Sequence, residues 1–316
     1  AHWNYMPDWE TEENVPVARI AEPDSAQGTT ERNVSADRKT IGVFDSGIGG
    51  FTVAGAILKR RPDLNLVYYA DSVNLPYGGR SQEQLARLSC NIIEFLLTQQ
   101  IDILADGCNT SHSALNSGEL RNYDVPIYDL VSSTVDWIRK QRLPESVALL
   151  ATEATVRSGW WEAKLSEALP GIPFTAIPAP ELVPLIESAQ QDERALREAV
   201  GHYMKLARES GADTVVLGCT HYPLVQNMMA DADIYLRLVD PAQCLAEKLT
   251  SQLAASGAEL QPSHAGESEV PPHLTPGSMC FYNSRPSERF YAVGERVFGK
   301  PIRDVTRMYI VNPYED

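Results

Sequence analysis

Two short segments of the chain repeat one pattern, and this repeat constrains the fold more than any other feature. In each segment an apolar run ends in Gly-Cys and is followed by residues with helical periodicity. The cysteines are Cys108, after the run 101–105, and Cys219, after the run 214–217. A strand that ends in a turn before a helix holds the turn residue at the carboxyl edge of a parallel sheet, where ligands bind. We therefore expect two matched α/β units whose cysteines face one substrate from opposite sides.

The helix after each cysteine adds an electrostatic expectation. Backbone amides at the start of a helix attract negative charge, and they favour the thiolate, which is the reactive form of cysteine. Both thiols are therefore predicted to be exposed at the crevice and ionised. A cofactor-free racemase needs one sulfur that takes a proton on one face of the substrate and a second sulfur that returns a proton on the other face.

The composition fits a globular enzyme and argues against several other classes. The 316 residues are 43% hydrophobic, enough for one large α/β domain or two smaller ones. A formal net charge of −15 is unfavourable for binding nucleic acid. No apolar run approaches the ~18 residues of a membrane span, and the first residues do not resemble a secretory signal. Five cysteines without regular spacing form no disulfide framework, so we expect a cytoplasmic protein with free thiols.

Short apolar runs alternate with helical patterns from residue 40 onward, which predicts an α/β fold with parallel sheets and crossover helices. Strands are expected at 40–44, 66–70, 101–105, 147–151, 174–177, 214–217, 236–239, 279–282 and 305–311. The clearest helices are expected at 51–61, 82–99 and 194–208.

Two stretches lack this alternation. Residues 1–39 are polar and acidic, and they are predicted to form either a flexible tail or a regulatory arm that docks through Trp3, Tyr5 and Trp9. Residues 256–277 are rich in Pro, Ser and Glu and are predicted to form a long surface loop.

A glycine-rich segment, 45–50 (Asp-Ser-Gly-Ile-Gly-Gly), follows the first predicted strand. It lacks the Gly-Lys-Ser/Thr end of a P-loop, and its glycines do not have dinucleotide-binding spacing. We interpret it as a carboxylate and a hydroxyl held at a strand end, with glycines that let backbone amides approach an anionic substrate.

The cysteines leave three other interpretations open. Cys108 and Cys219 could be buried structural residues, as we expect for Cys90, Cys244 and Cys280. A zinc site would draw on both cysteines together with His112 and His221, although structural zinc sites favour tighter clusters. A cysteine hydrolase would need one nucleophile and one base, so it would not explain the second cysteine.

Seven motifs then carry a family resemblance. They lie at 45–50, 71–78 (with Leu-Pro-Tyr-Gly), 108–110, 151–155 (Ala-Thr-Glu-Ala-Thr), 181–187 (Glu-Leu-Val-Pro-Leu-Ile-Glu), 217–224 (Leu-Gly-Cys-Thr-His-Tyr-Pro-Leu) and 239–241. In order and spacing the chain resembles the glutamate racemases of the aspartate/glutamate racemase superfamily. The resemblance covers roughly residues 41–250, and the motif at 217–224 is the most specific.

The resemblance implies two pseudo-symmetric α/β lobes, each a mainly parallel sheet flanked by helices, with the active site between them. Lobe A would comprise residues 40–130 and 240–316, lobe B residues 131–239, and residues 1–39 would form an N-terminal extension.

Roles follow by resemblance, residue by residue. Cys108 and Cys219 would be the acid/base thiols, with Asp45 assisting the first and His221 and Glu187 the second. Six residues would bind the substrate: Ser46, Tyr77, Gly78, Asn109, Thr110 and Thr220.

The implied activity is the interconversion of L- and D-glutamate for peptidoglycan precursors, without cofactor or metal. No lysine has a convincing Schiff-base context, so nothing in the sequence requires pyridoxal phosphate. The resemblance allows two further partners: a cell-wall nucleotide precursor as activator, and a second copy in a homodimer. Neither nucleic acid nor membrane is expected to bind. Two alternatives stay open: an aspartate or broad acidic amino-acid racemase, and a catalytically weak homologue with a binding or regulatory role.

Three residues depart from the usual family pattern. Asp106 ends a predicted buried strand, where a carboxylate is costly unless it is paired. His112 resembles a histidine that follows the first cysteine motif in aspartate racemases. Ala179 replaces a cysteine that often precedes the Glu-Leu-Val-Pro stretch. These departures bear on the choice between glutamate and aspartate.

Overall fold

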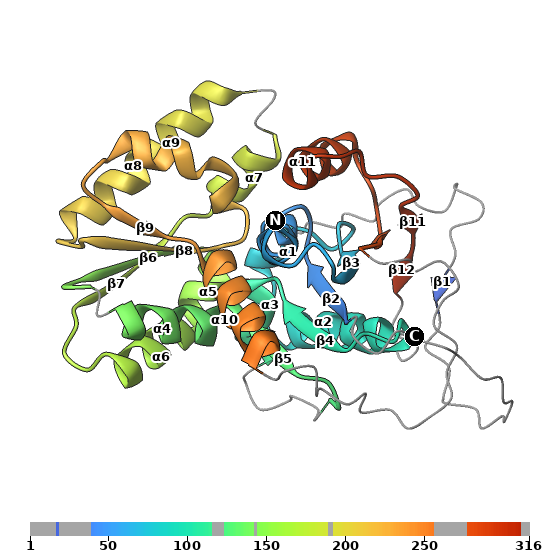
Figure 1. The fold of residues 1–316 in the computed structure, drawn as a ribbon. Helices are drawn as coiled ribbons and strands as arrows, with labels where there is room; N and C mark the ends of the chain where they lie inside the picture. Colours follow the sequence, from blue (N-terminus) through green and yellow to red (C-terminus); the bar gives the residue numbers. More distant parts are fainter. Residues whose placement is uncertain are drawn as a thin grey trace, which may run out of the picture.

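The apolar runs form two parallel sheets, one in each of two lobes (Figure 1). The computed structural model describes residues 17–18, 39–115, 123–141, 144–188, 192–255 and 277–310. The predicted fold class, two α/β lobes with mainly parallel sheets flanked by helices, is confirmed. The predicted lobe boundaries stay a prediction.

The larger sheet has six strands in the order β11-β10-β3-β2-β4-β5, and every pairing is parallel. β2 and β3 lie at its centre and are buried along their whole length. The C-terminal stretch joins this sheet because β10 pairs with β3. The strands are β2 (Thr40–Asp45), β3 (Asn65–Ala70), β4 (Ile103–Asp106), β5 (Ile127–Asp129), β10 (Met279–Asn283) and β11 (Thr306–Arg307).

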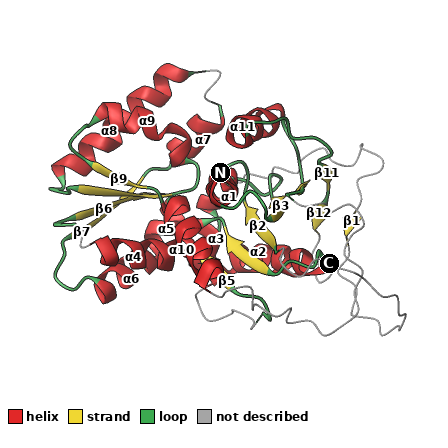
Figure 2. Ribbon diagram, viewed as in Figure 1, coloured by secondary structure: helices red, strands yellow, loops and turns green. Residues whose placement is uncertain are grey.

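The smaller sheet has four parallel strands in the order β7-β6-β8-β9. It lies at the left of Figures 1 and 2, with α8 and α9 above it and α4 and α6 below. Its strands are β6 (Val147–Ala151), β7 (Phe174–Pro178), β8 (Thr214–Gly218) and β9 (Arg237–Val239).

The helices are held by apolar faces and by polar caps. Ser81 and Gln84 form a capping box at the start of α2, and Asp192 caps α8 through the Ala195 amide. The helices are α1 (Gly50–Arg60), α2 (Gln82–Thr98), α3 (Asn109–Leu115), α4 (Leu130–Gln141), α5 (Glu153–Ser158), α6 (Trp160–Ala168), α7 (Leu182–Glu187), α8 (Glu193–Glu209), α9 (Gln226–Ala232), α10 (Pro241–Ala255) and α11 (Glu288–Phe298). Two 3₁₀ turns occur at Tyr77–Gly79 and Tyr222–Val225.

Some expected strands are shifted or divided. The strand predicted at 101–105 runs from Ile103 to Asp106. Just before it, the Asp102 side chain accepts hydrogen bonds from Lys39 and from the Thr40 amide. The stretch 305–311 forms two separate short strands, β11 and β12 (Tyr309–Ile310). The short strand β5 was not predicted, since three residues are too few to show a period.

The N-terminal extension contributes one described element. β1 (Val17–Ala18) pairs in parallel with β12, so these two residues join the folded part rather than a free tail. The aromatic residues proposed to dock, and almost all of the loop predicted at 256–277, lie outside the described residues. Across the described ranges, no helix has both the length and the apolar character to cross a membrane.

An aromatic cluster attaches the C-terminal helix α11 to the larger sheet. The Phe51 ring stacks on Tyr68 from β3 with centroids 4.7 Å apart, and it lies at the same distance from Phe290 of α11. Phe281 of β10 and Phe298 of α11 complete the cluster. Because these rings are buried, except for the partly buried Phe298, they fix the position of α11 against α1, a helix that begins at the candidate site.

Replacing Phe290 with alanine should therefore lower the free energy of unfolding by about 3–5 kcal/mol, the usual effect of removing a buried ring. Tyr291→Ala is the matched control, because its side chain is 40% exposed whereas Phe290 is 1% exposed. The control should change stability by about 1 kcal/mol or less. Urea unfolding of both variants measures the difference, and equal effects would contradict the packing described.

Candidate active site

A pocket that contains both cysteines lies between the two lobes, and most of the loops that line it follow the carboxyl ends of parallel strands. Its cavity measures about 190 Å³. Lobe A contributes Ser46, Leu75–Gly79 and Cys108–Thr110, which follow β2, β3 and β4. The smaller sheet contributes Thr152, Ala179 and Cys219–His221, which follow β6, β7 and β8. The predicted arrangement is present, since Cys108 and Cys219 reach the same pocket from opposite lobes.

The glycine before each cysteine is required by close packing at the strand end. A Cβ at Gly107 would lie 2.8 Å from the Phe44 carbonyl oxygen. A Cβ at Gly218 would lie 3.0 Å from the Ala151 Cβ and 3.1 Å from the Leu150 carbonyl oxygen. The repeated Gly-Cys pattern thus reflects the same physical need in both lobes, to turn the chain against a neighbouring strand.

Cys108 differs from its sequence prediction. The side chain is buried, with 4% of its surface exposed, and burial raises the pKa of its thiol well above the ordinary value. The negative charge of Asp45 raises this pKa further, while hydrogen bonds with Ser111 lower it. The expectation of an exposed thiolate is therefore wrong for Cys108, because desolvation outweighs the nearby helix amides. Burial and the charge of Asp45 thus favour the protonated form of the Cys108 thiol. The expected exposure is also wrong for Cys219, which is only 6% exposed.

Asp45 links the two lobes across the cleft. One of its oxygens accepts a hydrogen bond from the Gly47 amide at 2.9 Å, and the other accepts one from the Thr220 hydroxyl at 3.1 Å. The Thr52 hydroxyl also donates to the Thr220 carbonyl oxygen at 3.2 Å. A Cβ at Gly49 would overlap Thr220 and His221, so the glycine-rich segment allows the lobes to approach this closely.

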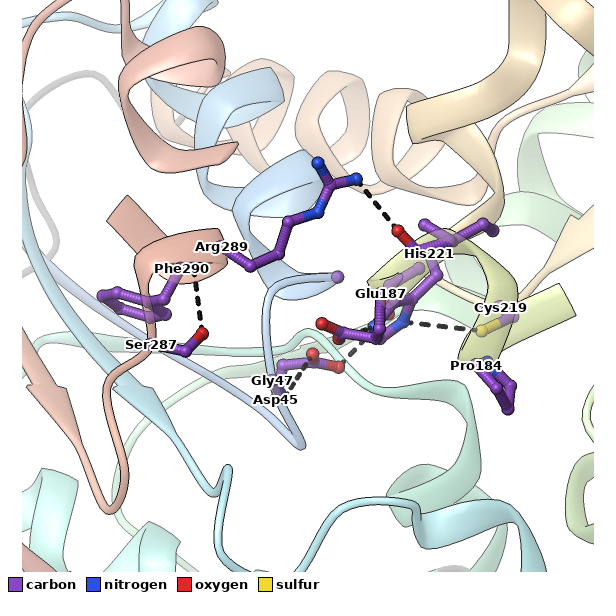
Figure 3. Close-up of polar contacts among 12 residues, drawn as sticks. Asp45, Gly47, Pro184, Glu187, Cys219, His221, Ser287, Arg289 and Phe290 are labelled. Atoms are coloured by element: carbon purple, nitrogen blue, oxygen red, sulfur yellow. Dashed lines mark hydrogen bonds and ion pairs between the residues drawn. The ribbon is translucent and has the colours of Figure 1, made fainter. Parts of the chain in front are cut away.

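Cys219 belongs to a chain of three polar side chains (Figure 3). Its sulfur lies 3.9 Å from His221 Nδ1, and His221 Nε2 lies 2.7 Å from Glu187 Oε1. Burial lowers the pKa of His221, but its contacts with Cys219 and Glu187 outweigh burial and raise the pKa well above the ordinary value. These contacts therefore favour the charged form of His221.

A lobe A side chain holds the end of the helix that carries Glu187. Arg289, from α11, donates a hydrogen bond to the carbonyl oxygen of Ile186 at 2.9 Å (Figure 3). Ile186 is the neighbour of Glu187 in α7. This contact was not predicted, because no motif marked the C-terminal helix.

All six residues predicted to bind the substrate line the pocket: Ser46, Tyr77, Gly78, Asn109, Thr110 and Thr220. Asn109 is the most informative of them. Its amide oxygen and nitrogen are both buried, and neither has a hydrogen-bond partner among the described residues. Buried polar groups rarely stay unpaired, so this amide is suited to receive a polar ligand. The Tyr77 hydroxyl, in contrast, already donates to Asp71 at 2.7 Å.

Other predicted residues act from behind the pocket wall. Asp45 and Glu187 do not line the cavity, and each reaches it through a partner, Thr220 or His221. Sequence reasoning gave no role to Thr152, although its motif was noted. Its hydroxyl lies in the wall, 3.0 Å from the Thr110 hydroxyl.

His112 does not contact the pocket. Its two ring nitrogens face Asp106 at 3.0 Å and Asp129 at 3.3 Å. It therefore gives no support to a substrate-selecting role by direct contact. It is equally unsuited to the zinc site considered from the sequence, and no cluster of three or more metal-ligating side chains occurs in the described ranges.

Comparison with known proteins places this geometry in a family. Residues 53–249 match the model for Asp/Glu/hydantoin racemases. A glutamate racemase from Syntrophus aciditrophicus (strain SB) is 31% identical over 277 residues, which span 87% of this chain and 98% of the relative.

Solved structures agree on the fold. A glutamate racemase from Bacillus anthracis superposes with a TM-score of 0.73 at 23% identity, over 87% of this chain and 98% of the other. The Escherichia coli glutamate racemase, solved with L-glutamate and the activator UDP-MurNAc-Ala, gives a TM-score of 0.67 at 24% identity, over 86% and 97%.

The charge of His221 leads to a pH-dependent stability. A group whose pKa is raised by folding stabilises the fold fully below its unfolded pKa, about 6.5 for histidine, and this contribution is lost as pH rises through the folded pKa. The difference in unfolding free energy between the wild type and His221→Gln should therefore be largest at pH 6 and shrink toward pH 10. His202→Gln, on the exposed surface of α8, is the control and should show no such trend. A difference that grows with pH would mean that His221 is neutral in the fold.

Proposed function

Because this chain belongs to the Asp/Glu/hydantoin racemase family, we propose that it is a cofactor-independent racemase that interconverts L- and D-glutamate. The observation that carries the proposal is the placement of Cys108 and Cys219 in one pocket, each from a different lobe. A planar carbanion formed between two such groups can receive its proton on either face. The names of curated relatives at about 30% identity support glutamate as the substrate.

The reaction balances with the two sulfurs alone. One thiolate takes the α-proton, and the electron pair of the C–H bond stays on the substrate as a carbanion conjugated with its carboxylate. The opposite thiol then donates its proton to the other face and becomes a thiolate. No net electron transfer occurs, and after one turnover the protonation states of Cys108 and Cys219 are exchanged.

The ligand-free site supports this division of labour. Cys108 carries a proton because of burial and the charge of Asp45, so it is suited to act first as the acid. Cys219 lies beside a charged His221, which suits it to act first as the base. Glu187 keeps His221 charged and oriented from the far side of the ring.

The remaining pocket residues are suited to bind a dicarboxylate with an ammonium group. Hydroxyls of Ser46, Thr110, Thr152 and Thr220 and the free amide of Asn109 offer donors for carboxylates and acceptors for the ammonium. Fixed dipoles of this kind stabilise developing charge in a site that excludes water. They are the groups that would hold the carbanion in the absence of a cofactor.

We further propose that the product serves peptidoglycan precursor synthesis in the cytoplasm. The Escherichia coli enzyme is solved with a nucleotide activator, which supports testing the same class of molecule here. A homodimer stays a prediction from the family resemblance.

Removing either thiol should abolish racemisation. Cys108→Ser and Cys219→Ser should each lower kcat by at least about 10²-fold, the usual contribution of a general acid or base. Proton NMR in D₂O should still show slow α-hydrogen exchange with one enantiomer only, and with opposite enantiomers for the two variants. Cys280→Ser, outside the pocket, is the control and should behave as the wild type. Near wild-type racemisation by either pocket variant would overturn the two-thiol proposal.

The substrate can be tested separately. Glutamate and aspartate differ by one methylene, and a pocket distinguishes such a step by about 1–3 kcal/mol. We expect kcat/KM for L-glutamate to exceed that for L-aspartate by about tenfold or more. Polarimetry with and without a cell-wall nucleotide precursor measures the ratio. A preference for aspartate under both conditions would favour the aspartate racemase, and no turnover of either amino acid would favour a binding role.

A further inference from the structure

A second buried chain of acid, histidine and acid lies behind Cys108. His112 Nδ1 is 3.0 Å from Asp106 Oδ2, and His112 Nε2 is 3.3 Å from Asp129 Oδ1. Asp106 ends β4, Asp129 ends the neighbouring strand β5, and His112 lies in α3. The side chains of Asp106 and His112 are only 1% and 8% exposed. The Asp129 side chain is 17% exposed, and the cluster of three does not line the pocket.

This cluster holds both backbone polar groups of Cys108. Asp106 Oδ1 accepts a hydrogen bond from the Cys108 amide at 3.2 Å. The His112 amide donates to the Cys108 carbonyl oxygen at 3.0 Å. Asp106 therefore uses one oxygen for Cys108 and the other for the ring of His112, so any change at the ring is transmitted to the residue that carries the thiol.

The charges in the cluster favour a protonated histidine. Burial lowers the pKa of His112, but the hydrogen bond to Asp106 and the charges of Asp129 and Asp106 raise it above the ordinary value. Burial raises the pKa of Asp106, opposed by His112. Both shifts mean that the pair retains a proton near neutral pH. Packed from α6, Lys164 opposes the charge on His112, and Trp160 contacts the ring edge-on.

Asp106 is also one of the groups that act on the thiol. Its negative charge raises the pKa of Cys108, as does the charge of Asp45 from β2. Cys108 therefore faces two carboxylates. The described residues place no cation against its sulfur as directly as His221 is placed against Cys219. A positive charge on the far side of Asp106 is the available means of limiting this repulsion.

We propose that His112 is a positioning residue for Cys108: as an imidazolium held by Asp129, it neutralises Asp106 and fixes that carboxylate on the Cys108 amide. This inference rests on the proposed function, because it takes Cys108 as one of the two reacting thiols. It gives each thiol its own acid–histidine pair, in direct contact at Cys219 and through Asp106 at Cys108. The departures at Asp106 and His112 then act on the chemistry rather than on the choice of substrate.

Steady-state rates alone cannot reveal an effect that is confined to Cys108. A racemisation has an equilibrium constant of one, so kcat/KM must be equal in the two directions for every variant. The effect has to be read on the thiols themselves. Both thiols line the pocket, so a small reagent such as iodoacetamide can reach each of them, and peptide mass spectrometry separates their rates.

The decisive experiment is the rate of Cys108 alkylation from pH 6 to 9.5 in the ligand-free full chain. At pH 6.5, His112→Asn should slow Cys108 by about three- to tenfold, the effect of roughly half to one pKa unit. The two rates should converge at alkaline pH, as the wild-type imidazole loses its proton. Asp106→Asn should have the opposite sign and speed Cys108 at pH 9, because it removes a negative charge but keeps a side chain able to bond the amide.

Cys219 in the same molecule is the internal control and should keep its wild-type profile in both variants. His202→Asn controls for the substitution itself, since that residue lies on the exposed surface of α8. If His112→Asn does not fold, Asp129→Asn replaces it and should show a smaller shift of the same sign. The cluster would have only a structural role if the alkylation rates of Cys108 and Cys219 changed equally. The same would follow if the variants at 106 and 112 changed the Cys108 rate in the same direction.

The outcome is separable from the proposed function. Alkylation requires no turnover, so a protein that fails to racemise glutamate still reports whether His112 controls Cys108. A protein that racemises glutamate but shows unchanged Cys108 profiles would overturn the His112 proposal alone.

Discussion

The hydrogen bond between Thr220 and Asp45 joins the two halves of the site, and the geometry of the pocket depends on it. The hydroxyl comes from the loop after β8 in one lobe and the carboxylate from the end of β2 in the other. Thr52 adds a second contact from α1, and Arg289 a third from α11 to the end of α7. Two thiols on different lobes can act on one carbon only if the distance between the lobes is fixed. The aromatic cluster around Phe51 transmits the same constraint, because it fixes α11 against α1.

A row of aspartates along the larger sheet sets the electrostatics of the pocket. The neighbouring strands β2, β4 and β5 end at Asp45, Asp106 and Asp129, and Asp71 directly follows the adjacent strand β3. Each carboxylate is paired. Asp71 accepts hydrogen bonds from Tyr77 and Asn74, and Asp45 accepts them from Gly47 and Thr220. Asp106 contacts Cys108 and His112, and Asp129 contacts Ser132 and the same His112. Such a row would repel an acidic substrate if it were bare. Burial raises the pKa of Asp71 and Asp106, and the paired donors offset the remaining charge.

The sequence predicted the strands and helices that repeat a motif or carry an apolar period. It did not predict the features that depend on which segments contact one another in the fold. The strands that hold Cys108 and Cys219 were found because Gly-Cys after an apolar run has one local cause, which is packing against a neighbouring strand. The six residues predicted to bind the substrate were identified through motifs, and all of them line the pocket. The burial of Cys108 could not be foreseen, because it depends on neighbours such as Tyr77, Leu85 and Ala154, which come from other parts of the chain. The contacts of Asp106 and His112 depend on β5, a strand too short to leave a pattern, and Arg289 lies in a helix without a motif.

The two enantiomers of the substrate have equal free energies, whereas the two thiols of the site have different surroundings. In the proposed mechanism an L-to-D turnover leaves the two sulfurs with their protons exchanged, so the enzyme must return to its first state before it accepts another L substrate. A strong preference for a protonated Cys108 would make the opposite state costly and slow the return. Burial and Asp45 both create that preference. A protonated His112 opposes it by neutralising Asp106, without bringing a cation into the cavity where it would compete for the substrate carboxylates. The cluster behind Cys108 thus lets a buried thiol serve as an acid in one direction and as a base in the other.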